Sequence, residues 1–93
     1  MTCDNYYLDL SAITTYINDL KDASIKEQIK KKIKKVKENP LIGETKRYQL
    51  TGTRAVKVNN QKIVILYKMD ENDPCKIVFI DIGSHKDVYS KTY

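Results

Sequence analysis

The chain has 93 residues, of which 41% are hydrophobic and 31% are charged. This balance is typical of a globular protein with one modest core, so we expect a single domain over residues 1–93. No apolar stretch approaches the roughly 20 residues that cross a bilayer, and Met1–Asn5 lacks the basic and apolar regions of a secretion signal. We therefore expect a cytoplasmic protein with no membrane partner.

Lys and Arg number 17 against 12 Asp and Glu, which gives a formal net charge of +5. A positive balance favours anionic partners, namely RNA, DNA or an acidic protein. Lys outnumbers Arg heavily, and this bias can also reflect genome composition or growth temperature. Charge alone therefore does not choose among the partners.

The two cysteines, Cys3 and Cys75, lie far apart in the sequence and show no metal-ligand spacing. The simplest interpretation is two free thiols, as is usual in a cytoplasmic protein. We accordingly expect neither a zinc site nor any other metal site.

The N-terminal half predicts a short strand and two helices. Tyr6–Leu10 alternates as a strand, and Ser11 offers an N-cap oxygen to a first helix. A break at residues 21–23 precedes a second helix, for which Ser24 and Glu27 form a capping-box pattern. Each helix carries one apolar stripe, so we expect an antiparallel helical hairpin with one apolar face. The stripes consist of Ile13, Tyr16, Ile17 and Leu20, and of Ile25, Ile29, Ile33 and Val36.

Asn39-Pro40 ends the second helix, because the residue before a proline is pushed out of the helical region. Strand patterns follow at residues 53–58, 63–67 and 77–82, with a possible short strand at 47–50. Asn59-Asn60 suits a tight hairpin turn, and the near-continuous apolar run at 63–67 indicates a central strand covered on both faces. The expected fold is α+β, with the N-terminal helical hairpin packed on one face of a small antiparallel sheet.

Lysines gather in the second predicted helix, over residues 30–37. They indicate a nucleic-acid-binding patch, since exposed cations release condensed counterions when they bind a polyanion. The alternative is the ordinary solvated face of an amphipathic helix. The sequence leaves both open.

Lys57 alternates away from Val56 and Val58, hence away from the helix-covered core. Arg54 lies near the start of the same strand, and Lys62 follows the predicted turn. Cations on a sheet can hold a phosphodiester and stabilise the extra negative charge of its transition state. The alternative is an ordinary solvated sheet face.

His85 is the lone histidine, and it follows a Gly-Ser break after the apolar run that ends at Ile82. Histidine is the side chain whose charge ordinarily changes near neutral pH, which suits acid–base chemistry on phosphates. Tyr89, four residues on, can serve as a stacking platform for a base. The alternatives are a loop histidine and a C-terminal aromatic residue that covers the core.

The order of these segments resembles the RelE/ParE superfamily of toxins from type II toxin–antitoxin systems. The closing Gly-Ser-His segment, with its aromatic residue four positions on, looks most like the YafQ branch. The resemblance covers roughly Ser24 to Tyr89. It rests on two helices followed by the segments at residues 39–43, 50–58, 63–67 and 82–89.

The resemblance implies a ribosome-dependent endoribonuclease that needs neither metal nor cofactor. In such toxins the 2′-hydroxyl attacks the adjacent phosphate, the 5′-oxygen leaves, and a 2′,3′-cyclic phosphate results. It further implies three partners: an antitoxin, expected to be an acidic protein, the ribosome and its mRNA. The implied catalytic residues are His85 as the acid for the leaving oxygen, Tyr89 and Lys57; the implied RNA-binding residues are Arg54, Lys62, Lys86 and Arg47.

The chain also departs from this pattern. YafQ-like toxins carry further histidines and RelE-like toxins more arginines, whereas here one histidine and mostly lysines are present. Lysine lacks the bidentate fork of arginine, so the general base is not assigned. Two alternatives remain: a ParE-like toxin that inhibits DNA gyrase by contact, and a degenerate toxin that only binds its antitoxin.

Overall fold

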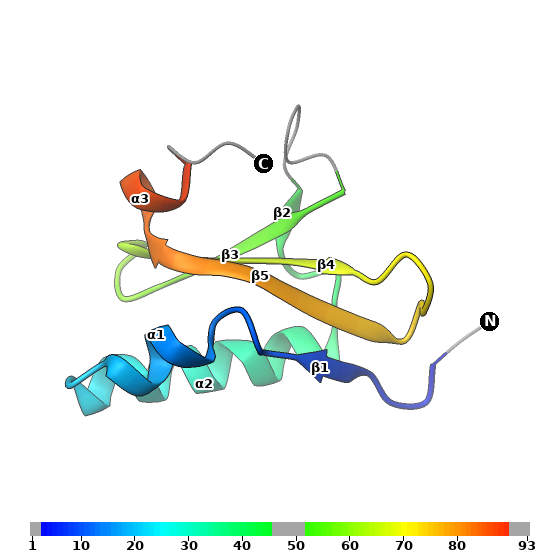
Figure 1. Ribbon diagram of the computed structural model, residues 1–93, viewed down its shortest axis with the longest axis horizontal. Coiled ribbons are helices and arrows are strands. Elements are labelled where there is room, and N and C mark those ends of the chain that lie inside the picture. Colours follow the sequence, from blue (N-terminus) through cyan, green and yellow to red (C-terminus); the bar gives the residue numbers. More distant parts are fainter. Residues whose placement is uncertain (1–2, 46–51, 90–93) are drawn as a thin grey trace.

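The computed structural model describes residues 3–45 and 52–89 as three helices and five strands in one sheet (Figure 1). The strands lie in the spatial order β1-β5-β4-β3-β2. Along the chain the elements are β1 (Tyr7–Asp9), α1 (Thr14–Asp19), α2 (Ala23–Glu38), β2 (Glu44–Thr45), β3 (Arg54–Val58), β4 (Ile63–Met69), β5 (Lys76–Ser84) and α3 (His85–Tyr89). The strand considered at residues 47–50 falls outside the described residues.

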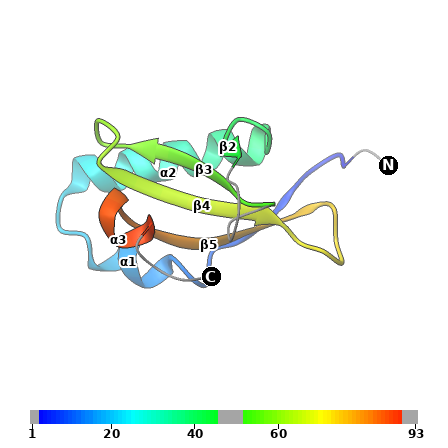
Figure 2. The ribbon, with the colours of Figure 1, turned by 90° about the horizontal axis from the view of Figure 1, so that it is seen from above.

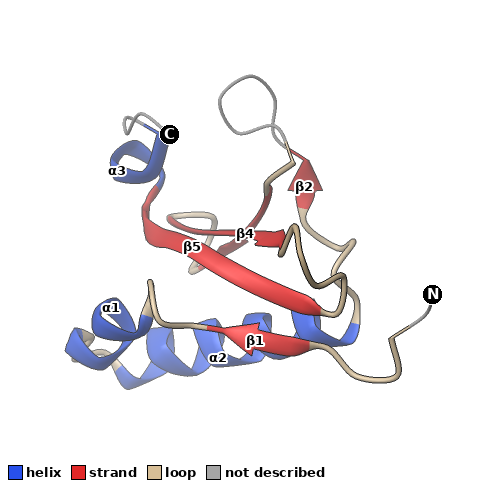
Figure 3. Cartoon of the chain, turned by 45° about the vertical axis from the view of Figure 1, so that its right-hand side comes forward, coloured by secondary structure: helices blue, strands red, loops and turns tan. Residues whose placement is uncertain are grey.

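The predicted α+β architecture is confirmed. Strands β2 to β5 pair antiparallel, and α1 and α2 lie together under one face of the sheet (Figures 1 and 2). The sequence did not predict that β1 pairs with β5 in parallel, in the register Leu8 with Ile77 (Figure 3). A parallel pair requires a crossover, and here nearly the whole chain forms that connection.

Both helices begin at residues other than the predicted caps. Asp22 caps α2, since its carboxylate accepts hydrogen bonds from the backbone N–H groups of Ser24 and Ile25. The predicted capping box at Ser24 and Glu27 is therefore wrong, because both residues already lie inside the helix. Ser11 does not cap α1, which begins at Thr14; its hydroxyl donates to Asp9 instead.

The apolar stripes pack as predicted. Ile29, Ile33 and Val36 of α2 are buried against the sheet, and Asn39 ends the helix. Strand β4 is buried on both faces from Ile63 to Tyr67, as expected for a central strand. We call the larger cluster, between the helices and the sheet, the helix-side core. It comprises Ile13, Ile29, Ile33, Val36, Val56, Val58, Ile63, Ile65, Tyr67, Ile77, Phe79 and Ile82.

The turn between β3 and β4 uses left-handed backbone, as the two asparagines predicted. Asn59, Asn60 and also Gln61 have φ of 54°, 55° and 68°. Asparagine tolerates this region better than most residues, because its short amide can bond the local backbone. The turn is closed by the N–H of Lys62, which donates to the carbonyl of Asn59 at 3.1 Å.

The segment from α2 to β2 is held by Tyr67. The Tyr67 hydroxyl donates to the carbonyl of Pro40 at 2.7 Å and accepts the N–H of Gly43 at 2.9 Å. A Cβ at Gly43 would lie 2.5 Å from this hydroxyl and 2.9 Å from Cβ of Arg54. The position therefore accepts only glycine without rearrangement.

The expectation of two free thiols is wrong for this structure. Cys3 and Cys75 form a disulfide with a Cα–Cα distance of 5.6 Å across 72 positions of sequence. Spacing along the chain does not reveal the pairing, because the parallel placement of β1 beside β5 brings the two residues together. The N–H of Tyr7 donates to the carbonyl of Cys75 at 2.8 Å, next to the bridge. Of the helices described, none has the length and apolarity to span a bilayer.

Removal of the Tyr67 hydroxyl should destabilise the protein. Tyr67→Phe leaves the Pro40 carbonyl and the Gly43 N–H without this partner in a buried site, which should cost about 1–3 kcal/mol of unfolding free energy. Urea denaturation measures the loss, with Tyr7→Phe as the control because Tyr7 is 68% exposed. Equal stability of the two variants would contradict the role of this hydroxyl.

The same tyrosine should make the fold sensitive to alkali. Burial raises the pKa of Tyr67 above its usual 10.0, although the Gly43 N–H and Arg54 oppose the shift. The unfolded chain then loses this proton first, so the contribution is fully present below pH 10.0 and is lost as the pH rises toward the folded value. Tyr67→Phe should flatten that part of the stability profile above pH 10.0 relative to Tyr7→Phe.

Loss of the disulfide should lower stability through the unfolded state. The double variant Cys3→Ser, Cys75→Ser should lose about 2–4 kcal/mol in urea denaturation, because the bridge closes a long loop in the unfolded chain. The wild-type protein in excess reductant should match the variant. Identical denaturation midpoints with and without reductant would show that the bridge does not form in solution.

Candidate functional site

The sheet face opposite α1 and α2 carries a smaller apolar cluster and the candidate site. We call it the open face. Ala55, Val64 and Leu66 are buried there, Ile80 packs beside them, and Val88 of α3 covers them. Figure 1 shows α3 above the end of β5, on the side of the sheet away from α1 and α2. The open face is thus covered by α3 at one end.

His85 is the first residue of α3 and is exposed. Gly83 and Ser84 are the last two residues of β5, paired with Val64 and Ile63, so the predicted break before the histidine is wrong. Ser84 instead caps α3, because its hydroxyl accepts the N–H of Asp87 at 3.1 Å. The local sequence therefore carries the strand directly into α3 and sets His85 at the junction.

Two predicted lysines lie near this junction. The His85 N–H donates to the carbonyl of Lys62 at 3.3 Å, which joins the β3–β4 turn to the start of α3. Lys57 pairs with Val64, which in turn pairs with Gly83. Two strand spacings place the Lys57 backbone about 10 Å from that of Gly83. The structure thus brings Lys57, Lys62 and His85 to the same end of the sheet.

Further charged residues belong to the open face. Lys68 continues the alternation of Val64 and Leu66 along β4, and Asp81 pairs with Leu66. Asp81 reaches this face because Tyr67 pairs with Phe79, which leaves Ile80 as an extra residue in a β-bulge. Alternation alone could have predicted Lys68. Asp81 was not predictable, because the bulge changes the alternation within β5.

Arg54 lies on the other side of the sheet from Lys57. It pairs with Tyr67 of the helix-side core, and its guanidinium donates to the carbonyls of Leu41 at 3.2 Å and Gly43 at 2.8 Å. These bonds hold the segment between α2 and β2. Arg54 and Lys57 are three residues apart on β3, and strand side chains an odd number of residues apart point to opposite faces of the sheet. RNA binding by Arg54 stays a prediction, and Arg54 does not lie on the same face of the sheet as Lys57.

The remaining predicted residues are placed only by their backbone or not at all. Lys86 is exposed in the first turn of α3, next to His85. Tyr89 is the last residue of α3, directly after the buried Val88. Arg47 lies outside the described residues. Their roles in catalysis and RNA binding stay predictions.

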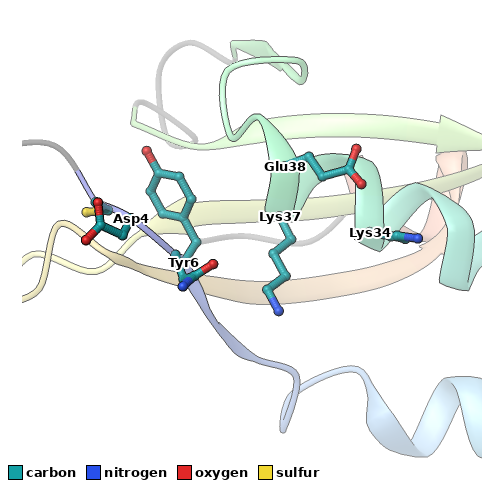
Figure 4. Close-up of a pocket in the computed structure, with 7 residues that line it drawn as sticks. Asp4, Tyr6, Lys34, Lys37 and Glu38 are labelled. Carbon is teal, nitrogen blue, oxygen red and sulfur yellow. The ribbon is translucent and has the colours of Figure 1, made fainter.

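Other parts of the described structure offer less chemistry. Across residues 3–45 and 52–89, no group of three or more His, Cys, Asp or Glu side chains could hold a metal ion. A cavity of about 650 Å³ lies between the N-terminal segment and the end of α2, with Tyr6, Lys34, Lys37 and Glu38 around it (Figure 4). It lies beside the disulfide, before β5 begins, and so at the opposite end of that strand from His85.

Comparison with known families decides the identity of the chain. Residues 7–92 match the family described as ParE-like toxin of type II bacterial toxin–antitoxin system. The chain belongs to this family. It is a type II toxin–antitoxin toxin of the RelE/ParE superfamily, as the resemblance implied.

Solved structures agree on the fold of this toxin. A double mutant of the E. coli toxin RelE in the free state is 24% identical, with a TM-score of 0.69 over 95% of this chain and 94% of that one. The intact E. coli RelBE toxin–antitoxin complex is 23% identical, with a TM-score of 0.67 over 85% and 95%. The RelBE2 toxin–antitoxin complex from Mycobacterium tuberculosis is 17% identical, with a TM-score of 0.69 over 87% and 99%. No curated protein sequence matches the toxin significantly.

The attachment of α3 to the open face should depend on Val88. Val88→Ala removes two buried carbons, so the toxin should lose about 2 kcal/mol of unfolding free energy. Urea denaturation measures this, with Lys86→Ala as the control because that side chain is exposed. If both variants unfold at the wild-type midpoint, α3 is not held by this contact.

Proposed function

We propose that the toxin is a ribosome-dependent mRNA endoribonuclease whose open face binds the scissile phosphate. The observation that supports this most is the position of His85 at the start of α3, joined to Lys62 by a backbone hydrogen bond and on the same end of the sheet as Lys57. The E. coli RelE structures share the fold, which is compatible with the proposal.

In the proposed reaction the 2′-oxygen of the substrate attacks the adjacent phosphorus to form the 2′,3′-cyclic phosphate, and the proton of the 2′-hydroxyl passes to a water molecule. The bond from phosphorus to the 5′-oxygen breaks, and His85 gives a proton to that oxygen. Lys57 and Lys62 neutralise the charge that accumulates on the phosphate oxygens. Tyr89 orients a neighbouring base, and Lys86, Arg54 and Arg47 contribute cations to the RNA.

Control of the toxin belongs to the same proposal. Two of the similar structures are toxin–antitoxin complexes, and the cationic charge of this toxin suits an acidic protein. We expect an antitoxin to bind the toxin and inhibit it. Because inhibition needs no proton transfer, antitoxin binding should not require the imidazole of His85.

A second candidate function follows from the family. The matching family is described as ParE-like, and the resemblance links ParE-type toxins to inhibition of DNA gyrase by contact. Such a toxin would need neither an acid nor a base. The two functions therefore differ in whether His85 is required.

Replacement of His85 distinguishes the ribonuclease function from the ParE-like function. His85→Ala should reduce cleavage of mRNA on programmed ribosomes by roughly 10²–10⁴-fold, since a positioned acid contributes about that much. Mapping of mRNA 5′ ends measures the cuts, with ribosome-free RNA as a parallel reaction. Glu71→Ala is the control variant, because Glu71 is exposed in the turn before β5.

The affinity of each variant for the co-expressed antitoxin should stay at the wild-type value. Intact mRNA with the folded wild-type toxin, together with loss of DNA supercoiling by gyrase, would support the ParE-like function instead. Full toxicity of His85→Ala would remove the histidine from the mechanism.

A further inference from the structure

A groove of about 370 Å³ lies between α2 and the turn that joins β3 to β4. We call it the lysine groove. Every charged side chain that lines it is a lysine, and the other lining residues are amides except for Val58. The lysines are Lys31, Lys32 and Lys35 of α2 and Lys57 of β3; the amides are Gln28, Asn59, Asn60 and Gln61.

The fold builds this groove from both sides. Ile29, Ile33 and Val36 are buried against the sheet, and this fixes the rotation of α2 that presents its lysines here. The Gln28 side-chain oxygen accepts the N–H of Asn59 at 3.0 Å, which ties the turn to the helix. Both sides of the lysine groove, α2 and the β3–β4 turn, are therefore held in place by packing and hydrogen bonding.

The groove runs along the part of β3 that β2 leaves unpaired. In the described structure β2 pairs only with Arg54 and Ala55, so Val56–Val58 have no strand partner on this side. Lys57 belongs to this stretch and faces the open face as well. It is the one lysine shared by the lysine groove and the candidate site.

The lining indicates the chemistry of the ligand. The groove is lined by four lysines and no carboxylate, so the lysine charges repel one another. A bound anion offsets this electrostatic repulsion. Lysine is a point charge that suits phosphate oxygens, and amides add hydrogen bonds to phosphate or sugar. A protein partner would need apolar anchors, yet Val58 is the only apolar lining residue.

We propose that the lysine groove binds the sugar-phosphate backbone of an RNA, as a second contact outside the site of cleavage. The choice of RNA rests on the proposed function, and the phosphate chemistry rests on the groove itself. Through Lys57 the bound backbone continues from the open face over the edge of β3 toward α2. The lysines of α2 then anchor RNA without taking part in the reaction.

The chain offers a matched pair of variants for the test. The groove variant is Lys31→Gln, Lys32→Gln, Lys35→Gln. The control variant is Lys30→Gln, Lys34→Gln, Lys37→Gln, which removes equal charge from the same helix at positions that do not line the groove. Glutamine and lysine have similar helix propensity, so both variants should keep the wild-type circular dichroism and melting curve.

The probe is a short, fluorescein-labelled, fully 2′-O-methylated RNA, which cannot be cleaved through its 2′-oxygen. Fluorescence anisotropy over a series of salt concentrations gives the affinity and its salt dependence. The groove variant should reduce the slope of log K against log salt by about 2, from three phosphate contacts on a single strand. The control variant should retain the wild-type slope.

Three results would overturn the proposal. Equal loss in both variants would mean diffuse attraction by the whole helix, and an unchanged slope in the groove variant would mean that RNA binds elsewhere. If the groove variant loses affinity for the antitoxin and keeps its affinity for RNA, the groove belongs to an acidic protein segment. When the groove variant alone loses affinity for RNA, sedimentation with ribosomes, with and without mRNA, distinguishes ribosomal RNA from mRNA as the source of the backbone.

The binding measurement does not depend on cleavage. Slope loss confined to the groove variant supports the RNA contact even when the wild-type toxin leaves mRNA intact on ribosomes. In that case the proposed ribonuclease function fails and the lysine groove remains a nucleic-acid contact. Failure of one proposal is therefore distinguishable from failure of the other.

Discussion

The burial of β4 on both faces is the constraint from which the rest of the structure follows. Ile63, Ile65 and Tyr67 face the helix-side core, while Val64 and Leu66 face the open face. A strand without a polar face must be covered twice. The helical hairpin covers one side, and α3, anchored by Val88, covers an end of the other.

This double covering also positions the candidate chemistry. Because α3 is needed to bury Val64 and Leu66, the residue that starts it is held at the end of the sheet, and that residue is His85. The core on the other face uses Tyr67 and Arg54 to hold the segment after α2. Lys57, Lys68 and Asp81 are charged strand residues of the open face. The bonds of Tyr67 and Arg54 and the candidate chemistry thus lie on opposite faces of the sheet.

The disulfide raises a question about the environment in which the toxin works. Cys3 and Cys75 join the N-terminal segment to the turn before β5, beside the short parallel pairing of β1. Disulfides persist in oxidising compartments and are reduced by the thiol systems of the cytosol. The bridge and the expected cytoplasmic location therefore demand different redox conditions. In a reducing environment β1 would be held by its three backbone pairings, the packing of Leu8 and the ion pair between Asp9 and Lys76.

The sequence by itself determined the elements whose signals are local. Apolar periodicity predicted α2 and β4, and Asn59-Asn60 predicted the left-handed turn. It also predicted the family, through the Gly-Ser-His segment and the order of helices and strands. The predicted helix caps were wrong, because Asp22, two residues before Ser24, caps α2, while α1 begins after Ile13 without a side-chain cap.

Only the tertiary structure decided which distant residues meet. It paired β1 with β5, joined Cys3 to Cys75, and inserted the bulge at Ile80 that carries Asp81 to the open face. It also separated Arg54 from Lys57 and brought Lys57 to the lysines of α2. Local signals report the conformation of neighbouring residues along the chain. Contacts across the sheet depend on register and on the packing of both cores at once, which no short segment contains.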